Sequence, residues 1–404
     1  MGIPGVEHTT GTTELWAMGG VALLVFYSNY MVAPLIPTFS EEFGVTPYRL
    51  GWLVPGFSIA YGISTLVYGV VSDRFGRVPV LAILLVFASL ATVLVSFATT
   101  ARELIALRIL SGIGTGGMVT IALADIGDRY PYVVQGRPMG WIFGAVAAGM
   151  GLGSSLGPIL NPVVGWRNEF RVLACGFFII AIFLVQRFKS LINRKRRPCR
   201  SIASEYLCIL DAPRGGRTMV FIFCNAIFQG GVFAWLGLLI ANRYHLRDVG
   251  IGIVLLGYGL PDLFFGGIIG GWADRYGRRY VIPMGFLLAG VCALFLALPI
   301  SSFLAALLIT ALSVGFETTH PLMSSITTSL DPKYRGQITG LATFAKFLGM
   351  AVGALLFERL MHISFSTALV AFAVSQILVG LGAIWAFRGE YPAMPIALEQ
   401  NART

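Results

Sequence analysis

The sequence has little charge for its length, and few of the residues that catalysis and metal binding use. Only 12% of its 404 residues are charged, whereas a soluble domain carries about 25%. It has 4 histidines and 5 cysteines, and the cysteines form neither a CxxC pair nor a metal-ligand spacing. No nucleophile–base set, phosphate loop or metal cluster is visible. These absences argue against a soluble protein and against an enzyme, and we expect no cofactor. The cysteines are interpreted as packing residues.

What the sequence has instead is long apolar stretches. Its hydrophobic share is 56% and its mean hydropathy is +0.79. Each stretch, at about 20 residues, is long enough to cross a bilayer, so we predict an all-α membrane protein of twelve helices. The predicted spans are Trp16–Phe39, Leu50–Val71, Val78–Phe97, Leu104–Ile126, Gly136–Leu160, Phe170–Phe188, Met219–Ile240, Val249–Trp272, Val281–Leu298, Phe303–Thr328, Gly336–Leu356 and Thr367–Phe387.

The spans divide the chain into two bundles of six. The predicted units are an amino-terminal tail (1–15), a first bundle (16–188), a linker (189–217), a second bundle (218–388) and a carboxyl-terminal tail (389–404). Met1–Glu14 is short and polar and has no apolar centre, so we expect no cleavable signal peptide. In the linker, Ser201–Leu210 is compatible with an amphipathic helix on the membrane surface. The linker's basic residues either fix topology in water or recognise anionic lipid.

Basic residues set the expected orientation, because Lys and Arg collect in cytoplasmic loops. With the amino terminus inside, 20 of the 29 Lys and Arg fall in inner loops and the carboxyl-terminal tail. We therefore predict a multi-pass protein of the cell's inner (plasma) membrane with both termini in the cytoplasm. The net charge of +10 is explained by this pattern, and we expect no nucleic-acid partner.

One nine-residue stretch occurs twice. Gly69–Arg77 (GVVSDRFGR) is followed 201 residues later by Gly270–Arg278 (GGWADRYGR), and Pro131 has a counterpart at the same offset in Pro332. Each copy lies between two apolar segments, which predicts a tight charged hairpin and an internal duplication of about six helices. The glycines permit a turn with positive φ, and the carboxylates can pair with the arginines or with a helix dipole. The predicted cytoplasmic gate consists of Gly69, Asp73, Arg74, Gly76, Arg77, Asp128, Gly270, Asp274, Arg275, Gly277 and Arg278.

The two copies resemble the signature G-x-x-x-D-R-x-G-R of the major facilitator superfamily. The twelve spans and the central linker extend that resemblance over nearly the whole chain. It implies a transporter whose two six-helix halves rock about a central site. Leu107–Gly116 is similar to the family's fourth-helix motif, and Gly144–Pro158 to the fifth-helix motif of its proton-coupled drug exporters.

The fifth-helix stretch also has a meaning of its own. Gly149, Gly153 and Gly157 clear one helix face, so that another helix can approach closely and slide, and Pro158 adds a bend. Close packing without any role in export explains the same residues. Pro162 stands where the family continues with glycine, which is a departure from the motif.

Four ionisable residues fall within predicted spans of the second bundle, where they cost at least about 2.5–3.5 kcal/mol each. Asp262 lies in the eighth span, Glu317 and His320 share a face of the tenth, and Lys346 lies in the eleventh. The resemblance implies that all four reach a central cavity, where proton and cation compete for an acidic site. Two alternatives stay open: Lys346 forms a permanent structural bridge with one of the acids, and His320 is a packing histidine.

The first bundle offers polar residues in place of an acid. Its first span has Asn29 and Tyr30 where several drug exporters carry an acid, so we expect coupling in the second bundle. Arg108, in the fourth span, either binds a substrate carboxylate or organises the cavity. Asn225 and Gln229, in the seventh span, complete the predicted cavity.

The sequence therefore predicts a monomeric secondary transporter with a small-molecule substrate. The favoured activity is proton-driven export of amphipathic or cationic molecules, of the multidrug efflux type. The first rival is a proton-coupled uptake symporter for a nutrient or organic acid, with Arg108 or Lys346 binding a carboxylate. A non-transporting receptor or a lipid flippase of the same fold is a further rival.

Overall fold

The protein is a bundle of long apolar helices. The computed structural model describes residues 10–130, 136–187, 213–258, 275–330 and 335–390. Within these residues, eleven helical stretches are long and apolar enough to cross a membrane. The predicted all-α membrane fold is thereby confirmed. The eighth predicted span is described only as the helix Asp248–Tyr258, and the rest of it lies outside the described residues.

The helices of the first half are α1 (Thr10–Tyr30), η1 (Ala33–Leu35), α2 (Ile36–Glu42), η2 (Pro47–Leu50), α3 (Leu53–Phe75), α4 (Arg77–Val95), α5 (Ala101–Thr115), α6 (Met118–Arg129), α7 (Gly136–Val164) and α8 (Trp166–Arg187). Those of the second half are α10 (Pro213–Tyr244), the helix Asp248–Tyr258, α12 (Arg278–Leu296), α13 (Ser302–Leu330), α14 (Arg335–Met361) and α15 (Phe365–Ala386). Because α10 begins at Pro213, the second bundle starts inside the range assigned to the linker.

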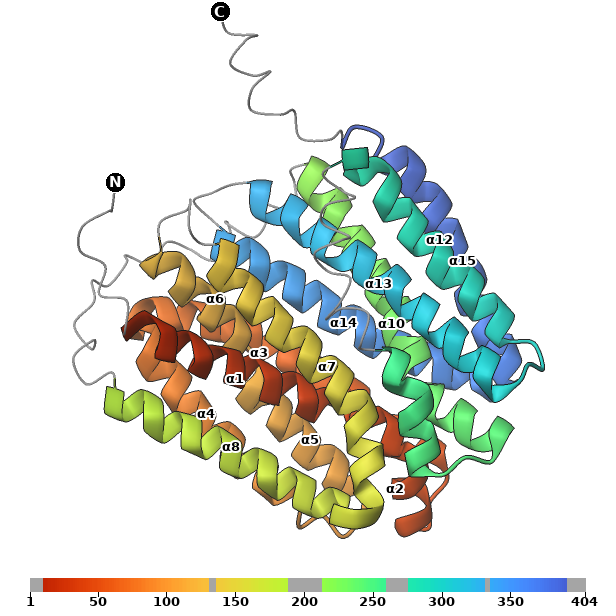
Figure 1. Cartoon of the computed structure of the whole chain (residues 1–404), viewed down its shortest axis with the longest axis horizontal. Helices are drawn as coiled ribbons and strands as arrows, with labels where there is room; N and C mark the ends of the chain where they lie inside the picture. Colours follow the sequence, from red (N-terminus) through yellow and green to blue (C-terminus); the bar gives the residue numbers. More distant parts are fainter. Residues whose placement is uncertain (1–9, 131–135, 188–212, 259–274, 331–334, 391–404) are drawn as a thin grey trace, which may run out of the picture.

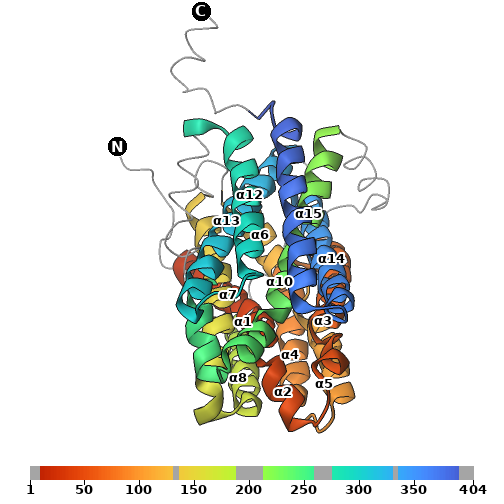
Figure 2. The same cartoon turned by 90° about the vertical axis from the view of Figure 1, so that its right-hand side faces the viewer.

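The two halves lie side by side with their long helices running in similar directions (Figures 1 and 2). In the first half, α1 packs on α7, α3 on α5 and α4 on α8. In the second, α10 packs on α14, and α12 packs on α13 and α15. The halves meet mainly where α3 contacts α14 and where α10 contacts η1.

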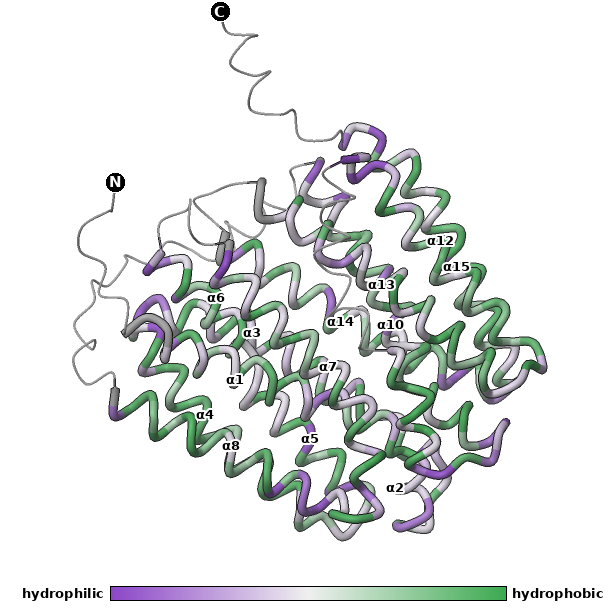
Figure 3. The backbone as a smooth tube through the Cα atoms, viewed as in Figure 1, coloured by the Kyte–Doolittle hydropathy of each residue, from purple (hydrophilic) through white to green (hydrophobic). Residues whose placement is uncertain are grey.

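Hydrophobic residues follow the lengths of the helices, and hydrophilic ones gather towards their ends (Figure 3). Many large apolar side chains face outwards, among them Ile83 on α4 and Ile179 on α8, which are 68% and 65% exposed. Soluble proteins rarely expose apolar surface on this scale, whereas a lipid-facing surface requires it.

Two predicted spans are interrupted. The first breaks after Tyr30, and the chain continues through η1 and α2, which have Pro34 and Pro37 at their starts. Proline has no backbone N–H, so it is tolerated in the first turn of a helix and not in its interior.

The fourth span divides between α5 and α6 at Gly116 and Gly117. A Cβ at Gly116 would lie 2.7 Å from the carbonyl oxygen of Tyr61, and Gly117 has a φ of +77°. Close approach to α3 and a left-handed turn therefore both require glycine here.

The helix directions define two ends of the bundle. We call the end that holds α2 and η2 the α2 end, and the opposite end, where α3 reaches Gly76, the hairpin end. The halves touch at the α2 end. The Tyr48 ring of η2 stacks on His362, which follows α14, with 4.4 Å between ring centroids, and a Cβ at Gly237 of α10 would lie 2.8 Å from the Cα of Pro34.

Candidate functional site

The two hairpin glycines have almost the same backbone conformation. Gly76 has φ 99° and ψ 145°, and Gly277 has φ 85° and ψ 147°. Each precedes the first residue of a helix, α4 or α12. Side chains with a Cβ are strained in this region, so the duplicated glycines are needed by the turn itself.

In the first hairpin the arginine is held by two acids. Arg77 Nη2 forms an ion pair with Asp73, and Arg77 Nε lies 3.4 Å from Oδ2 of Asp128 on α6. Arg77 Nη1 also donates to the hydroxyl of Ser72, at 2.7 Å. Three predicted gate residues thus meet and tie α3, α4 and α6 together. Arg74 instead extends over the Phe75 ring, and Gly69 lies within α3.

A second ion-pair group ties α1 to α6 in the first half. Arg129 Nη1 pairs with Glu14, and Arg129 Nε lies 2.5 Å from Oδ2 of Asp125. Nothing in the sequence marks Glu14 as an ion-pair partner, because it closes the short polar stretch Met1–Glu14.

In the second hairpin, Gly270 and Asp274 lie outside the described residues. Arg275 is exposed and lies over the Tyr276 ring, while Arg278 begins α12 and is half-buried.

Another acid fastens the same end of the second half, and the sequence analysis missed it. Glu390 follows α15 and binds Arg214 at 2.7 Å and Arg217 at 2.9 Å, both on α10. Burial by itself raises the pKa of Glu390, but the hydrogen bonds and charges of Arg214 and Arg217 outweigh burial and hold this pKa below its ordinary value. Its signal in the sequence was an acid three residues after the last predicted span, which ends at Phe387.

The fifth-helix glycines pack against α1. A Cβ at Gly149 would lie 2.5 Å from the Leu23 carbonyl oxygen, and one at Gly153 would lie 2.6 Å from that of Tyr27. A Cβ at Gly157 would lie 2.7 Å from the Cβ of Met31. α7 continues as a helix through Pro158 to Val164.

The second half repeats this contact 200 residues later. A Cβ at Gly349 would lie 2.6 Å from the carbonyl oxygen of Phe223, and one at Gly353 would lie 1.9 Å from that of Ile227. Both glycines are on α14 and both carbonyls are on α10. The duplication therefore includes a glycine contact that the sequence analysis noticed only in its first copy.

At mid-depth the halves meet through aromatic and amide side chains. Tyr30 of α1 accepts a hydrogen bond from Gln229 of α10 at 3.5 Å, and its ring centroid lies 4.8 Å from that of Phe233. Tyr61 of α3 stacks on Phe347 of α14 at 4.0 Å. The structure thus brings two predicted cavity residues, Tyr30 and Gln229, together across the junction.

Two other predicted polar residues of the cavity are buried. Asn29 of α1 is adjacent to Tyr30 in the chain and is 6% exposed. Asn225 of α10 donates to Thr319 Oγ1 and accepts from Gln376 Nε2, both at 2.9 Å. Asn225 therefore joins α10, α13 and α15 within the second half.

Arg108 is the fully buried cation of the first half, with 1% of its surface exposed. Its guanidinium carbon lies 4.2 Å from the centroid of the Phe57 ring, and Nη1 lies 3.4 Å from Ser28 Oγ. Its Nε has no hydrogen-bond partner among the described residues. No carboxylate among the residues that the structure describes pairs with Arg108, so an anion would find an uncompensated donor there.

The charged set of the second half is described only in part. Lys346 of α14 is 8% exposed, and its charge acts on His320 of α13. Glu317 is within α13, although its side chain is not described, and Asp262 lies outside the described residues. His320 and Lys346 thus lie on the contacting helices α13 and α14.

A polar cluster at the α2 end was missed by the sequence analysis. Asp248, the first residue of the helix Asp248–Tyr258, accepts hydrogen bonds from Thr38 Oγ1 and Asn161 Nδ2 of the other half, both at 2.6 Å. Buried Glu169 of α8 lies nearby, and its charge interacts with that of Asp248. Spacing along the chain gave no sign that these residues meet, because they belong to different bundles.

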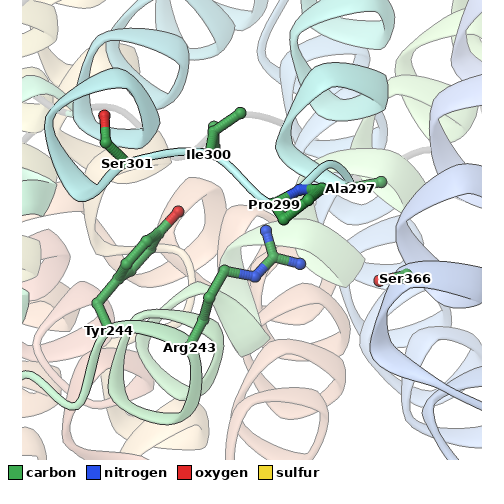
Figure 4. Close-up of a pocket in the computed structure, with 7 residues that line it drawn as sticks. All are labelled: Arg243, Tyr244, Ala297, Pro299, Ile300, Ser301 and Ser366. Carbon is green, nitrogen blue, oxygen red and sulfur yellow. The ribbon is translucent and has the colours of Figure 1, made fainter.

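A hollow of about 470 Å³ at the α2 end of the second half is separate from these groups (Figure 4). Arg243 lies beside it and donates to the carbonyl oxygens of Leu296 and Leu298 at 2.6 and 3.0 Å, so it caps the end of α12. Within the described ranges, no group of three or more His, Cys, Asp or Glu residues could hold a metal ion.

Comparison with known proteins gives a consistent result. The profile described as Major Facilitator Superfamily matches residues 18–247 and 218–402. The chain is 27% identical to the class E tetracycline resistance protein of Escherichia coli over 84% of this chain and 87% of that protein. It is 25% identical to the benzoate transport protein of Acinetobacter baylyi over 68% of this chain and 67% of that protein.

The solved inward-facing, unoccupied structure of a bacterial homologue of the human lysosomal transporter Spinster superposes with a TM-score of 0.77. It covers 95% of this chain and 98% of its own, at 16% sequence identity. At that identity the likeness establishes a shared fold.

Proposed function

The chain belongs to the major facilitator superfamily of membrane transporters, and from this premise we propose that it exports amphipathic or cationic small molecules in exchange for protons. It is a transporter and not an enzyme, and transporters of this family need no cofactor. Our proposal concerns the direction of transport, its coupling to protons and the class of substrate.

The observation that carries the proposal is the buried junction between the duplicated halves. The Tyr30–Gln229 contact and the aromatic pair Tyr61–Phe347 supply an amphipathic surface between them. Such surfaces suit ligands with an apolar body and few polar groups. Alternating access requires the two halves to part at such a junction, since the substrate site lies between the repeats.

Proton coupling is assigned to the second half. The charge of Lys346 on α14 acts on His320 of α13, and Glu317 is one turn before His320 on α13. We propose that Glu317 and Asp262 exchange proton for substrate, with Lys346 balancing one carboxylate. A buried ionisable group within a membrane helix has a functional role more often than a packing role.

The relatives support export and also leave a second candidate. The tetracycline resistance protein supports an exporter, while the benzoate transport protein is named for the movement of a carboxylate. Arg108, buried without a carboxylate partner in the described part of the chain, favours uptake of an organic acid as that second function. In this case Arg108 would bind the substrate carboxylate.

A transport assay separates the two candidates. Full-length protein in liposomes would be given a pH gradient and either tetraphenylphosphonium or benzoate. The export proposal expects tetraphenylphosphonium to move against the proton flow, and Glu317→Gln to abolish that coupling while the exposed-acid control Glu41→Gln preserves it. Benzoate moving with protons, lost in Arg108→Gln, would establish the second candidate. Transport of either probe that ignores the pH gradient would contradict proton coupling.

A further inference from the structure

The clearest polar link between the halves at the α2 end is formed by one carboxylate. Asp248 of the second half accepts from Thr38, which is on α2, and from Asn161, which is on α7, at 2.6 Å each. Asp248 also begins its helix, where the backbone dipole favours negative charge. The position therefore suits a hydrogen-bond acceptor that joins the halves.

A second carboxyl group, that of Glu169, lies next to the contact between Asp248 and the first half and has fewer hydrogen-bond partners than Asp248. Asn161 Oδ1 accepts from the backbone N of Trp166 at 2.7 Å, which fixes the start of α8 beside Asp248. Glu169, almost one turn further along α8, is 5% exposed. Its Oε2 lies 3.5 Å from the Tyr27 hydroxyl, and its Oε1 is buried without a hydrogen-bond partner in the part of the chain that the structure describes. An ionised carboxylate held in this way loses its hydration and gains little in return.

No base among the described residues neutralises Glu169. The two arginines on the same part of α8 have other partners: Arg167 pairs with Glu42, and Arg171 donates to Ser96 and Asn168. The titratable groups that act on Glu169 are Tyr27 from α1 and Asp248 from the other half. Joining the halves thus brings two carboxyl groups together, and a proton is needed on one of them. Asp248 has two short hydrogen bonds and Glu169 has one long contact, so a proton on Glu169 relieves the poorer of the two environments.

We propose that Glu169 is a proton-binding residue that controls contact between the halves at the α2 end. Protonated Glu169 is neutral, so Asp248 can approach and keep Thr38 and Asn161 as partners. When Glu169 releases its proton to water at that end, the repulsion between the two carboxylates and the hydration of Glu169 both favour separation. The joined state binds the proton more tightly, so it is favoured at low pH and is lost as pH rises. This inference concerns the rocking motion on which the proposed function depends, but it holds for either direction of transport.

A distance measurement across the α2 end tests the inference directly. Spin labels would replace the exposed Thr46 and Ile363, one in each half, in full-length cysteine-free protein in lipid nanodiscs without substrate. Pulsed electron spin resonance would record short (joined) and long (separated) distances from pH 5 to pH 9. In wild type we expect the ratio of short to long distances to fall by at least about tenfold, which corresponds to one pKa unit of difference between the two states.

Variants decide whether Glu169 is responsible. Glu169→Gln should give the short distance throughout the pH range, because an amide resembles the protonated carboxyl group. Asp248→Asn should extend the short distance to higher pH, since the repulsion is gone. Glu41→Gln, at an exposed acid of α2, should leave the wild-type profile unchanged. A wild-type profile retained in both Glu169→Gln and Asp248→Asn, or no pH dependence in wild type, overturns the inference.

Thermal unfolding of each variant would show that it is folded. If Glu169→Gln proves unstable, Asp248→Asn alone tests the inference. The measurement uses neither substrate nor gradient. A negative result in the distance measurement therefore does not contradict the export proposal, which the transport assay tests. A negative result in the transport assay likewise does not contradict this inference.

Discussion

The two halves of the transporter keep the same backbone contacts and differ in how charges fasten them. Gly76 and Gly277 adopt nearly the same φ and ψ, and the glycine pairs Gly149/Gly153 and Gly349/Gly353 meet equivalent carbonyls of α1 and α10. In these places a Cβ would be strained or would collide with backbone. Both halves therefore have glycine at the positions where the backbone geometry excludes a side chain.

Side-chain partners have diverged. Arg77 contacts both Asp73 and Asp128, but the residue 201 positions after Asp128 is Ser329. The second half instead ties α10 to the segment after α15 through Glu390. Ion pairs near a surface contribute little each, so their partners can change while the turn stays. The comparison predicts large effects at the duplicated glycines and small effects at the charges.

The largest effect is expected at the helix contacts. Gly353→Ala should lower the free energy of unfolding by about 3 kcal/mol, because its Cβ would meet backbone that cannot move cheaply. Gly153→Ala should cost less, since its Cβ would lie 2.6 Å from the nearest atom and that of Gly353 only 1.9 Å. Chemical unfolding in detergent measures both. Gly144→Ala on α7, with open space around its Cβ, is the control, and equal costs at all three positions would contradict the comparison.

The hairpin glycines should show the next largest effect, and an equal one in the two halves. Gly76→Ala and Gly277→Ala should each cost about 2 kcal/mol, because both backbones lie in a region strained for other residues. Gly69→Ala, in the same motif but within α3 and with open space around it, should cost nothing or stabilise the helix slightly. The same unfolding assay applies. A Gly76→Ala variant as stable as Gly69→Ala would show that the turn does not need glycine.

Loss of Glu390 should have an intermediate effect that depends on pH. Glu390→Gln should cost about 1–2 kcal/mol at pH 7, because two arginines lose a charged partner. The folded-state pKa of Glu390 is lowered, so its contribution is fully present above the unfolded pKa of about 4.3 and is lost as pH falls through the folded value. Unfolding temperatures of wild type and variant should therefore converge in acid. A constant gap across that range would contradict the ion-pair account.

The smallest effect is expected where the first half is made to resemble the second. Asp128→Ser should cost only about 0.5 kcal/mol, since Arg77 keeps Asp73 and the pair is partly exposed. Asp73→Asn alone should be similarly mild, and the double variant should lose more than the two single losses combined because Arg77 then keeps neither of these two acids. A double-mutant cycle measures this coupling. Strict additivity would mean that the two acids act independently.

Much of the fold could be predicted from the sequence. Hydropathy located the spans that the structure describes, and the 201-residue repeat identified the turn glycines Gly76 and Gly277. Both features can be seen in the sequence because contact with lipid requires apolar side chains and a strained turn requires glycine. The glycine run of α7 was also visible, and the close packing expected of it is seen against α1.

The contacts between distant segments could not be predicted. Asp248 meets Asn161, and Glu390 meets Arg214, although nothing in the spacing of either pair indicates a contact. Gly349 and Gly353 were not recognised because fewer glycines surround them than in α7. Which helix faces meet depends on the packing of the whole bundle. The pattern of residues within one segment does not determine that packing.

The most direct test of alternating access follows both ends of the junction in matched samples. One sample carries spin labels at Phe75 and Tyr276, the exposed counterparts in the two hairpins, and the other at Thr46 and Ile363 at the α2 end. As pH or substrate is varied, we predict that the hairpin pair shortens under the conditions in which the α2-end pair lengthens. Both distances changing in the same direction, or neither changing at all, would contradict two halves that rock about a central site.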